Sequence, residues 1–218
     1  MLPQWAEPAK QVARAIHQAN GQVYLVGGAL RDLILSRQPT DYDLATDLAP
    51  QRVIDLTEAE GWKVLPTGLR YGTVTIIVNG QPVEVTTFRS EKNYNDGRHP
   101  EDIEFGVSIE QDLARRDFTI NAIALSWPDG NWVDPWGGRE DLKNEVIRAV
   151  GDPGERFTED SLRMLRAIRF AAELGFSVEP VTNLALGARC EGIKRVAFER
   201  IGVELTRLML APTSGCVN

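Results

Sequence analysis

The segment that most constrains the fold of this chain is an apolar run that ends in two glycines. Residues 23–26 are apolar and β-prone, and Gly27 and Gly28 follow them directly. Glycine reaches backbone conformations closed to other residues, so the pattern predicts a strand, a tight turn and then a helix. The unpaired amides at the start of such a helix, together with Arg31, favour the binding of a triphosphate.

Two aspartates follow in a segment predicted to be extended, Asp41 and Asp43. Residues two apart in an extended chain point to the same face, so these carboxylates can hold a divalent metal together. A third carboxylate, Glu84, lies in the second strand of a hairpin that Asn79–Gly80 predicts. Glu84 can be a further catalytic carboxylate or simply an outward-facing strand residue.

Each of these features also has a plain structural explanation. Two glycines after a strand can form an ordinary turn, and two aspartates one residue apart can be a solvated strand end. Their joint occurrence in one short stretch, with a third carboxylate downstream, favours a nucleotidyltransferase site.

Two later motifs complete an ordered set. Residues 115–117 place two arginines before an aspartate, and residues 159–170 combine acidic residues with three regularly spaced arginines. The set resembles the motifs of class II tRNA nucleotidyltransferases, the CCA-adding enzymes, which share a fold with bacterial poly(A) polymerase. The resemblance extends from about residue 22 to residue 210, and residues 199–205 resemble the neck of that family.

The resemblance implies an α/β (α+β) nucleotidyltransferase head with a mixed, mainly antiparallel sheet, followed by an all-helical neck. We expect the head to span residues 1–150 and the neck residues 151–218, with a boundary near residues 151–154. Family members continue into helical body and tail domains that bind tRNA. We therefore expect this chain to be the head and neck of a longer enzyme.

The implied activity is template-independent addition of C and A to the 3′ end of tRNA, from CTP and ATP, with release of pyrophosphate. Mg²⁺ is the expected cofactor and Asp41 and Asp43 its expected ligands, with Glu84 as a further catalytic carboxylate. The expected nucleotide contacts are distributed over the whole motif set: Gly27, Gly28, Arg31, Arg116, Asp117, Glu159, Asp160, Arg163, Arg166 and Arg169.

Base recognition is expected from Glu159, Asp160 and Arg163. Cytosine and adenine present an amino donor beside a ring-nitrogen acceptor, whereas uracil and guanine reverse that order. A carboxylate only accepts and a guanidinium only donates, so Asp160 opposite the amino group and Arg163 opposite the ring nitrogen fit C and A.

A single helix is expected to carry Asp160 and the three arginines. Apolar residues at helical spacing predict a buried stripe that leaves the arginines in other directions: Leu162, Leu165, Ile168 and Ala172. The alternative is an ordinary solvated charged face.

Several activities share these head motifs. An A-adding or CC-adding specialist and a poly(A) polymerase are alternatives, and a non-catalytic nucleotide- or RNA-binding module is an alternative of another class. Asp41 and Asp43 count against the non-catalytic module. Residues 90–105, with a polar run at 91–100, predict a mobile loop. This loop argues against a CC-only enzyme, which resembles the others except for a shortened or altered loop here.

Composition bounds the class of protein. The formal net charge is −7, although RNA-binding proteins usually carry a basic surface. Either the basic residues cluster locally, as at Arg115 and Arg116, or the RNA-binding part lies outside this chain.

No apolar run is long enough to span a membrane and the first residues lack the regions of a signal peptide, so we expect a cytoplasmic protein with no membrane partner. Cys190 and Cys216 are expected to be free thiols, and no catalytic role is expected for His17 or His99.

Overall fold

The computed structural model describes residues 3–92 and 102–211, which fall into two compact units. The first unit consists of Met1–Glu91, Ile103–Arg115 and Asn121–Pro135, and the second of Lys92–Asp102, Arg116–Ile120 and Trp136–Asn218. These units differ from the domains expected at 1–150 and 151–218, because residues 116–120 and 136–150 cluster with the second unit.

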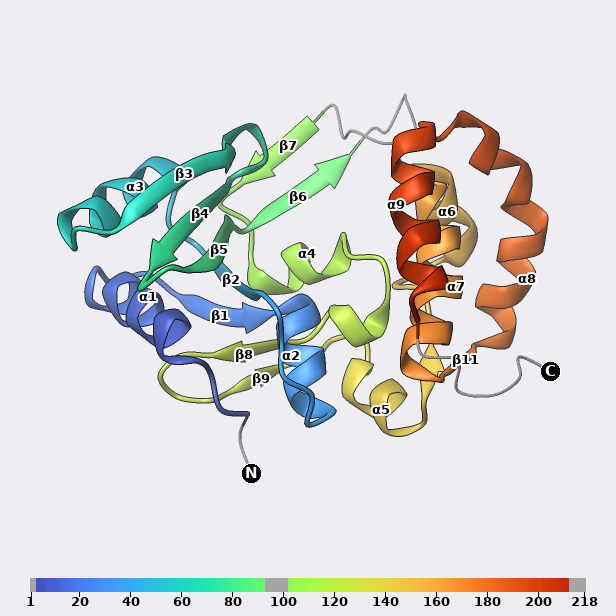
Figure 1. The fold of residues 1–218 in the computed structure, drawn as a ribbon, viewed down its shortest axis with the longest axis horizontal. Coiled ribbons are helices and arrows are strands. Elements are labelled where there is room, and N and C mark those ends of the chain that lie inside the picture. The colour runs from blue at the N-terminus through green and yellow to red at the C-terminus, as the bar shows by residue number, and fades with distance from the viewer. Residues whose placement is uncertain (1–2, 93–101, 212–218) are drawn as a thin grey trace. The chain divides into compact units, whose positions relative to one another are not determined.

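A seven-stranded sheet forms the centre of the first unit, in the order β3-β4-β5-β2-β1-β8-β9 (Figure 1). Strands β2 and β5 are parallel, and the other neighbouring pairs are antiparallel. The expectation of a mixed, mainly antiparallel sheet is therefore confirmed. The strands are β1 (Val23–Val26), β2 (Tyr42–Thr46), β3 (Lys63–Gly68), β4 (Thr73–Val78), β5 (Gln81–Thr87), β8 (Ala124–Ser126) and β9 (Trp132–Val133).

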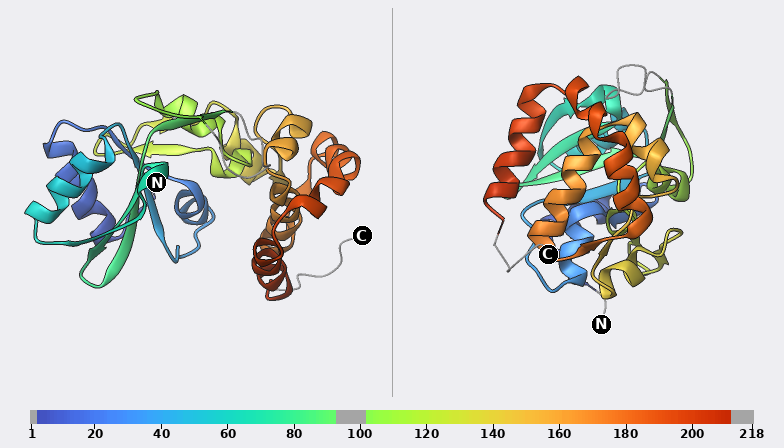
Figure 2. Two further views of the ribbon diagram at one scale, coloured as in Figure 1. Left: turned by 90° about the horizontal axis from the view of Figure 1, so that it is seen from above. Right: turned by 90° about the vertical axis from the view of Figure 1, so that its right-hand side faces the viewer.

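Helices α1 and α3 pack on each other and on the sheet (Figure 2). Tyr42 of β2 contacts the backbone of Ala6 at the start of α1, which identifies the face that these helices cover. The helical segments of this unit are α1 (Glu7–Gln18), α2 (Gly27–Ile34), α3 (Pro50–Ala59), α4 (Ile109–Ala114), the 3₁₀ turn η1 (Leu69–Tyr71) and the end of η2 (Thr119–Asn121).

The hairpin predicted at Asn79–Gly80 is confirmed. β4 and β5 are joined by these two residues alone, and both have positive φ, +52° for Asn79 and +80° for Gly80. Two consecutive positive φ values define the tight turn whose twist matches a β-hairpin, and Asn-Gly is the pair that adopts it most readily. The turn fixes the register of β5 and thereby the position of Glu84 within it.

The loop predicted over residues 90–105 is wrong at both ends. Residues Arg89–Lys92 form β6 and Asp102–Phe105 form β7, and the two strands make a separate two-stranded sheet. Polar residues obscured this pairing, because the shielded side chains of β6 are the charged Arg89 and Glu91, 12% and 8% exposed, and give no hydrophobic alternation. Most of the polar run at 91–100, from residue 93 on, lies outside the described residues, as do His99 and Cys216.

Helices dominate the second unit, and a short parallel pair of strands accompanies them. Phe118 packs edge-on against Phe170 with ring centroids 5.8 Å apart, and its backbone bridges to Ala149. These contacts explain why residues 116–120 belong here. The elements are α5 (Gly138–Lys143), β10 (Val146–Ile147), α6 (Pro153–Glu159), α7 (Leu162–Leu174), β11 (Ser177–Val178), α8 (Pro180–Arg189), η3 (Cys190–Arg195) and α9 (Phe198–Met209).

Strand β11 interrupts the region expected to be all-helical after residue 154, and it pairs with β10, which precedes that region. In the described part of the chain, no helix combines the length and apolar character needed to cross a membrane.

Candidate functional site

The glycine turn lies where β1 passes directly into α2. Gly27 is the first residue of α2 and has φ +68°, a left-handed conformation that favours glycine. No side chain caps this helix start. A Cβ added to Gly28 would lie 3.5 Å from Nη2 of Arg31, an ordinary contact, so Arg31 lies beside the second glycine of the turn.

Arg31, the expected phosphate contact of this turn, is largely buried at 9% exposure. Its Nε donates to Asp32 Oδ1 over 2.8 Å, and its Nη1 donates to Asn121 Oδ1 over 2.9 Å. The guanidinium is thus held by two partners beside the helix start, and its cationic charge lies within reach of the turn.

The carboxylates come together through strand register. Val26, directly before Gly27, pairs with Asp43, and Asp43 pairs across the parallel strands with Glu84. Burial alternates along β5, where Val83 and Val85 are buried and Glu84 is exposed. Asp43 and Glu84 therefore share the sheet face opposite to the one that Tyr42 shares with Val83.

Asp41 lies just before β2 rather than inside it, which corrects the strand predicted from Asp41 onward. It is exposed, and Thr40 Oγ1 donates to its Oδ2 over 3.2 Å. Within the described residues, neither Asp41 nor Glu84 forms an ion pair with a side chain, and no group of three or more His, Cys, Asp or Glu is arranged as a ready metal cage. Asp43 and Glu84 nevertheless share one face of the sheet, and one or two carboxylates from the protein are enough for Mg²⁺, which retains several waters.

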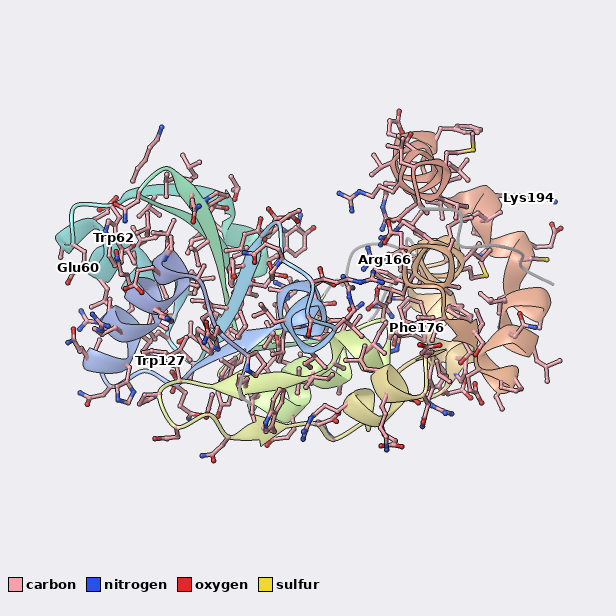
Figure 3. The ribbon with its side chains drawn as sticks, turned by 60° about the horizontal axis from the view of Figure 1, so that its bottom comes forward. Glu60, Trp62, Trp127, Arg166, Phe176 and Lys194 are labelled. Carbon is pink, nitrogen blue, oxygen red and sulfur yellow. The ribbon has the colours of Figure 1, made fainter. Side chains whose placement is uncertain are left out.

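In the second unit, Asp117 and Arg166 bind each other. Arg166 extends from α7 (Figure 3), and its Nε and Nη2 reach Asp117 Oδ2 over 2.8 and 2.7 Å. The other oxygen, Oδ1, accepts the Phe118 amide over 2.8 Å. Burial lowers the pKa of Arg166, but the charges and hydrogen bonds of Asp117 and Glu204 outweigh it, and the net pKa is raised. Two residues expected to contact the nucleotide separately are therefore one paired unit.

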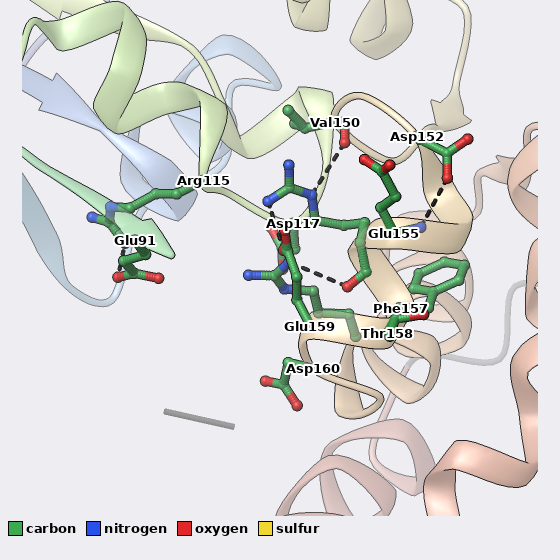
Figure 4. Close-up of polar contacts among 12 residues, drawn as sticks. Glu91, Arg115, Asp117, Val150, Asp152, Glu155, Phe157, Thr158, Glu159 and Asp160 are labelled. Carbon is green, nitrogen blue, oxygen red and sulfur yellow. Dashed lines mark hydrogen bonds and ion pairs between the residues drawn. The ribbon is translucent and has the colours of Figure 1, made fainter. Parts of the chain in front are cut away.

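Neighbouring arginines serve different networks. Arg115 belongs to the first unit, where its Nη1 contacts Glu91 over 3.1 Å (Figure 4) and its Nη2 contacts Asp112 over 2.9 Å. Arg116, the predicted site residue, clusters with the second unit and is half-buried.

Asp160 does not lie on the helix that carries the arginines, which corrects the expectation from the sequence. Helix α6 ends at Glu159, α7 starts at Leu162, and Asp160 adopts extended backbone angles between them (Figure 4). Arg163 is 8% exposed and donates through Nη1 to Glu159 Oε2 over 2.6 Å. Arg156 donates to the same oxygen over 2.9 Å.

The predicted apolar stripe of α7 is correct only in part: Leu162 is buried, and Leu165 and Ala172 are half-buried. Ile168 is 45% exposed, whereas Arg163 and Arg169 are buried together with Met164, Ala167 and Phe170. The arginines are buried because each finds an acidic partner, and aromatic contact adds to this. Arg169 contacts Glu204 over 2.5 Å and Glu173 over 2.6 Å, and its guanidinium lies 4.0 Å from the Phe170 ring centroid.

Three residues that were not predicted complete these networks: Arg156, Arg200 and Glu204. Arg200 makes a two-pronged contact with Asp160, and Glu204, which is 5% exposed, accepts from Arg166 and Arg169. Arg200 and Glu204 are four residues apart on α9, a spacing that ordinarily suggests a pair within one helix. The sequence placed Arg200 and Glu204 in the neck-like segment, residues 199–205. It did not reveal that Arg200 pairs with Asp160 or that Glu204 pairs with Arg166 and Arg169.

Comparison with known proteins gives a family match over most of the first unit and beyond. The model of the poly A polymerase head domain matches residues 23–148. A CCA-adding enzyme of Levilactobacillus brevis is 44% identical over 219 residues, covering 100% of this chain and 54% of the relative. One from Anoxybacillus flavithermus is 44% identical over 204 residues, covering 94% and 50%. The chain spans about half the length of the curated relatives it matches.

Solved structures agree. The Bacillus stearothermophilus CCA-adding enzyme in complex with CTP has a TM-score of 0.85 and 38% identity, covering 94% of this chain and 49% of that one. A tRNA nucleotidyltransferase complexed with a primer tRNA and an incoming ATP analog has a TM-score of 0.76 and 30% identity, covering 91% and 57%. The resemblance stated from the motifs is thereby confirmed, as is the expected head fold.

Proposed function

We propose that this chain, which belongs to the poly A polymerase head domain family, is the catalytic part of an RNA nucleotidyltransferase that adds C and A to the 3′ end of tRNA. The observation that carries the proposal is the strand register of the first unit. It aligns the end of β1 at the glycine turn, Asp43 and Glu84 across three neighbouring strands. The sequence identity of 44% to a CCA-adding enzyme supports the choice of reaction.

In this proposal, the first unit performs the transfer. Gly27, Gly28 and the amides that open α2 hold the triphosphate together with Arg31, because bare helix amides and a buried cation both favour phosphate. Asp41 and Asp43 hold Mg²⁺, and Glu84 lies beside Asp43 as a candidate for the same role. When bound, Mg²⁺ supplies charge that favours ionisation of the attacking 3′-hydroxyl and departure of pyrophosphate.

The second unit selects the nucleotide. Asp117 accepts from a ribose 2′-hydroxyl, which favours NTP over dNTP, and Arg166 holds that carboxylate in place. Arg116 adds positive charge for the phosphates, and Arg169, which was expected to contact the nucleotide, instead holds Glu204 together with Arg166. This division assigns transfer to the 1–150 part of the chain, apart from Arg116 and Asp117, and base selection to the 151–218 part.

Base choice rests on Glu159, Asp160 and Arg163. Asp160 accepts from the amino group of C or A, and Arg163, held by Glu159, donates to the ring nitrogen. U and G present the opposite order and leave both protein groups mispaired. Each buried mispaired group costs about 1–3 kcal/mol, so two together give a few hundredfold discrimination without a nucleic-acid template.

A poly(A) polymerase is the second candidate, because the matching family model describes that type of head. The experiment that separates the candidates uses the intact protein with Mg²⁺ and four tRNAs, which end before the first C, after C, after CC and after CCA. Each is incubated with one labelled nucleotide at a time. The CCA proposal predicts C addition to the first two, A addition to the third and no addition to the fourth.

A long A tail on the fourth substrate would favour poly(A) polymerase. Addition of C alone or of A alone identifies a specialist, and no incorporation by the intact protein contradicts an enzymatic role. Because tRNA is the proposed substrate, we further propose that the protein works in the cytoplasm.

A further inference from the structure

We propose that Arg200 is a positioning residue for base selection, which acts by holding the Asp160 carboxylate in one orientation. This inference rests on the proposed function, because it concerns how Asp160 accepts a hydrogen bond from the base. Arg200 comes from α9, forty positions along the chain from Asp160, so the contact depends on how α9 packs in the second unit.

The contact is two-pronged. Nη1 of Arg200 donates to Asp160 Oδ1 over 3.2 Å, and Nη2 donates to Oδ2 over 2.7 Å. Two parallel bonds from a planar guanidinium fix both the place and the plane of a carboxylate, which a single bond does not. The side chains are 23% and 14% exposed, so water competes only partly for these bonds.

Asp160 needs such a restraint because of where it lies. It occupies the break between α6 and α7 with φ −145° and ψ 103°, so no helix surrounds its side chain. The only other hydrogen bond to its carboxylate in the described part of the chain is donated by the Leu162 amide, over 3.1 Å to Oδ1. Without Arg200, the carboxylate is tied through one oxygen alone and can rotate.

The bonds from Arg200 and Leu162 leave one acceptor position on the Asp160 carboxylate for a base. A carboxylate offers about four lone-pair positions. Oδ1 accepts from Leu162 and Arg200, and Oδ2 accepts from Arg200 alone. One further position therefore remains, on Oδ2, with its direction set by the guanidinium. An exocyclic amino group can donate to it, whereas the carbonyl oxygen of uracil or guanine cannot.

Helix α9 is itself held in register by a second charged contact. Glu204, one turn after Arg200, accepts from Arg166 and from Arg169 on α7, and the two helices pack together. Arg200 and Glu204 thus pair with other elements rather than with each other. Arg200 is consequently presented to Asp160 from a helix that is fixed against α7.

The test measures kcat/KM for CTP and for UTP with a tRNA primer that ends before the first C, using the intact protein. Arg200→Ala is compared with Arg200→Lys and with the matched control Arg207→Ala, which removes an exposed arginine from the same helix. We expect Arg200→Ala to lower the CTP-to-UTP ratio about tenfold, the scale of one mispaired buried group. Arg200→Lys keeps the charge but cannot bond both oxygens as a fork, so it lowers the ratio as well, and Arg207→Ala leaves it unchanged.

A purely structural ion pair gives a different pattern, since it alters thermal stability and total activity but not the ratio. If Arg200→Ala and Arg200→Lys both keep the wild-type ratio while the wild-type protein adds C, the inference is overturned and the proposed function stands. If the wild-type protein adds no nucleotide, the proposed function itself has failed. Should Arg200→Ala prove unfolded by circular dichroism, the outcome for Arg200→Lys decides.

A double substitution tests whether Arg200 acts through Asp160. In an Asp160→Ala background, Arg200→Ala is expected to cause no further change in the CTP-to-UTP ratio, because the carboxylate that it orients is already gone. A second independent drop of similar size would show that Arg200 acts by another route and would overturn the inference.

Discussion

Two predicted site carboxylates of the first unit and two of the second unit lie in opposite surroundings. In the first, Asp41 and Glu84 lie on or beside the sheet with no ion pair among the described residues. In the second, Asp117 and Asp160 each accept hydrogen bonds from two nitrogens of one arginine, Arg166 and Arg200 respectively. In the proposed function, this difference separates carboxylates that take up a cation from carboxylates that are oriented for a ligand.

This contrast follows from what each task requires. A cation neutralises a triphosphate, and the carboxylates that hold this cation must be able to rearrange around it. Distinguishing bases instead needs hydrogen-bond donors and acceptors whose direction is fixed. Burying paired charges costs desolvation energy that the attraction offsets only when geometry is good. In the proposed function, the networks of the second unit therefore orient the groups that contact the base and are not a large source of stability.

The largest effect is expected when a carboxylate of the first unit is removed. Asp41→Ala or Asp43→Ala is expected to lower nucleotide addition by at least about a thousandfold, because bound metal contributes several kcal/mol to this chemistry. The free energy of unfolding should change by no more than about 1 kcal/mol. Single-turnover addition and chemical denaturation check the two parts, with exposed Asp129→Ala as control. Activity within tenfold of wild type would refute the metal assignment.

Glu84→Gln tests the third carboxylate, and a smaller effect is expected. The substitution keeps the size of the side chain on β5 and removes its charge beside Asp43. We expect a loss of about tenfold or more and a shift of activity to higher Mg²⁺ concentration. A Mg²⁺ titration of the rate measures this. Equal rates and equal Mg²⁺ dependence in variant and wild type would identify Glu84 as a strand residue only.

Arg163→Ala should lower kcat/KM for CTP and for ATP, because it removes the proposed donor to the ring nitrogen. The expected loss of transition-state stabilisation is about 1–3 kcal/mol for each nucleotide. The matched control is Arg156→Ala, which takes another arginine from the same Glu159 oxygen but has no proposed base contact. Both variants should be less stable than wild type. If the control reproduces the full kinetic loss, the effect of Arg163 comes from the network and not from the base.

The smallest expected effect concerns the pH dependence of the second unit. Burial raises the pKa of Glu179, but hydrogen bonds from Thr182 and Val181 and the charge of Arg148 outweigh it, and the net pKa lies below the usual 4.5. A lowered folded-state pKa means that this stability is present above 4.5 and is lost as pH falls through the folded value. Glu179→Gln should therefore lose less stability than wild type between pH 7 and pH 3, as measured by urea unfolding. Parallel pH curves for the two proteins would contradict this.

Local signals predicted part of the molecule well. Strand β1, the start of α2 and the Asn79–Gly80 turn follow from residues adjacent in sequence, and the structure has them where expected. The pairing of Asp43 with Glu84 is a parallel contact between distant segments, which no local pattern encodes.

The second unit shows where such reasoning fails. Ile168 was expected inside and Arg169 outside because side chains were sorted by polarity alone, yet Arg169 is 4% exposed. Its burial depends on Glu204, thirty-five positions later, and on the Phe170 ring. The break at Asp160 was likewise not foreseen, since nothing in the run from α6 to α7 resembles a helix terminator such as glycine or proline.

In the proposed function, Asp160 selects the base and the first unit transfers the nucleotide that has been selected. The measurement that tests it most directly is the ratio of kcat/KM for CTP and UTP in the wild-type protein and in Asp160→Ala, with a tRNA primer that ends before the first C. The account predicts a wild-type preference for CTP of about a hundredfold or more, and a fall in that preference when the acceptor is removed. An unchanged ratio in Asp160→Ala, at measurable activity, would contradict the account.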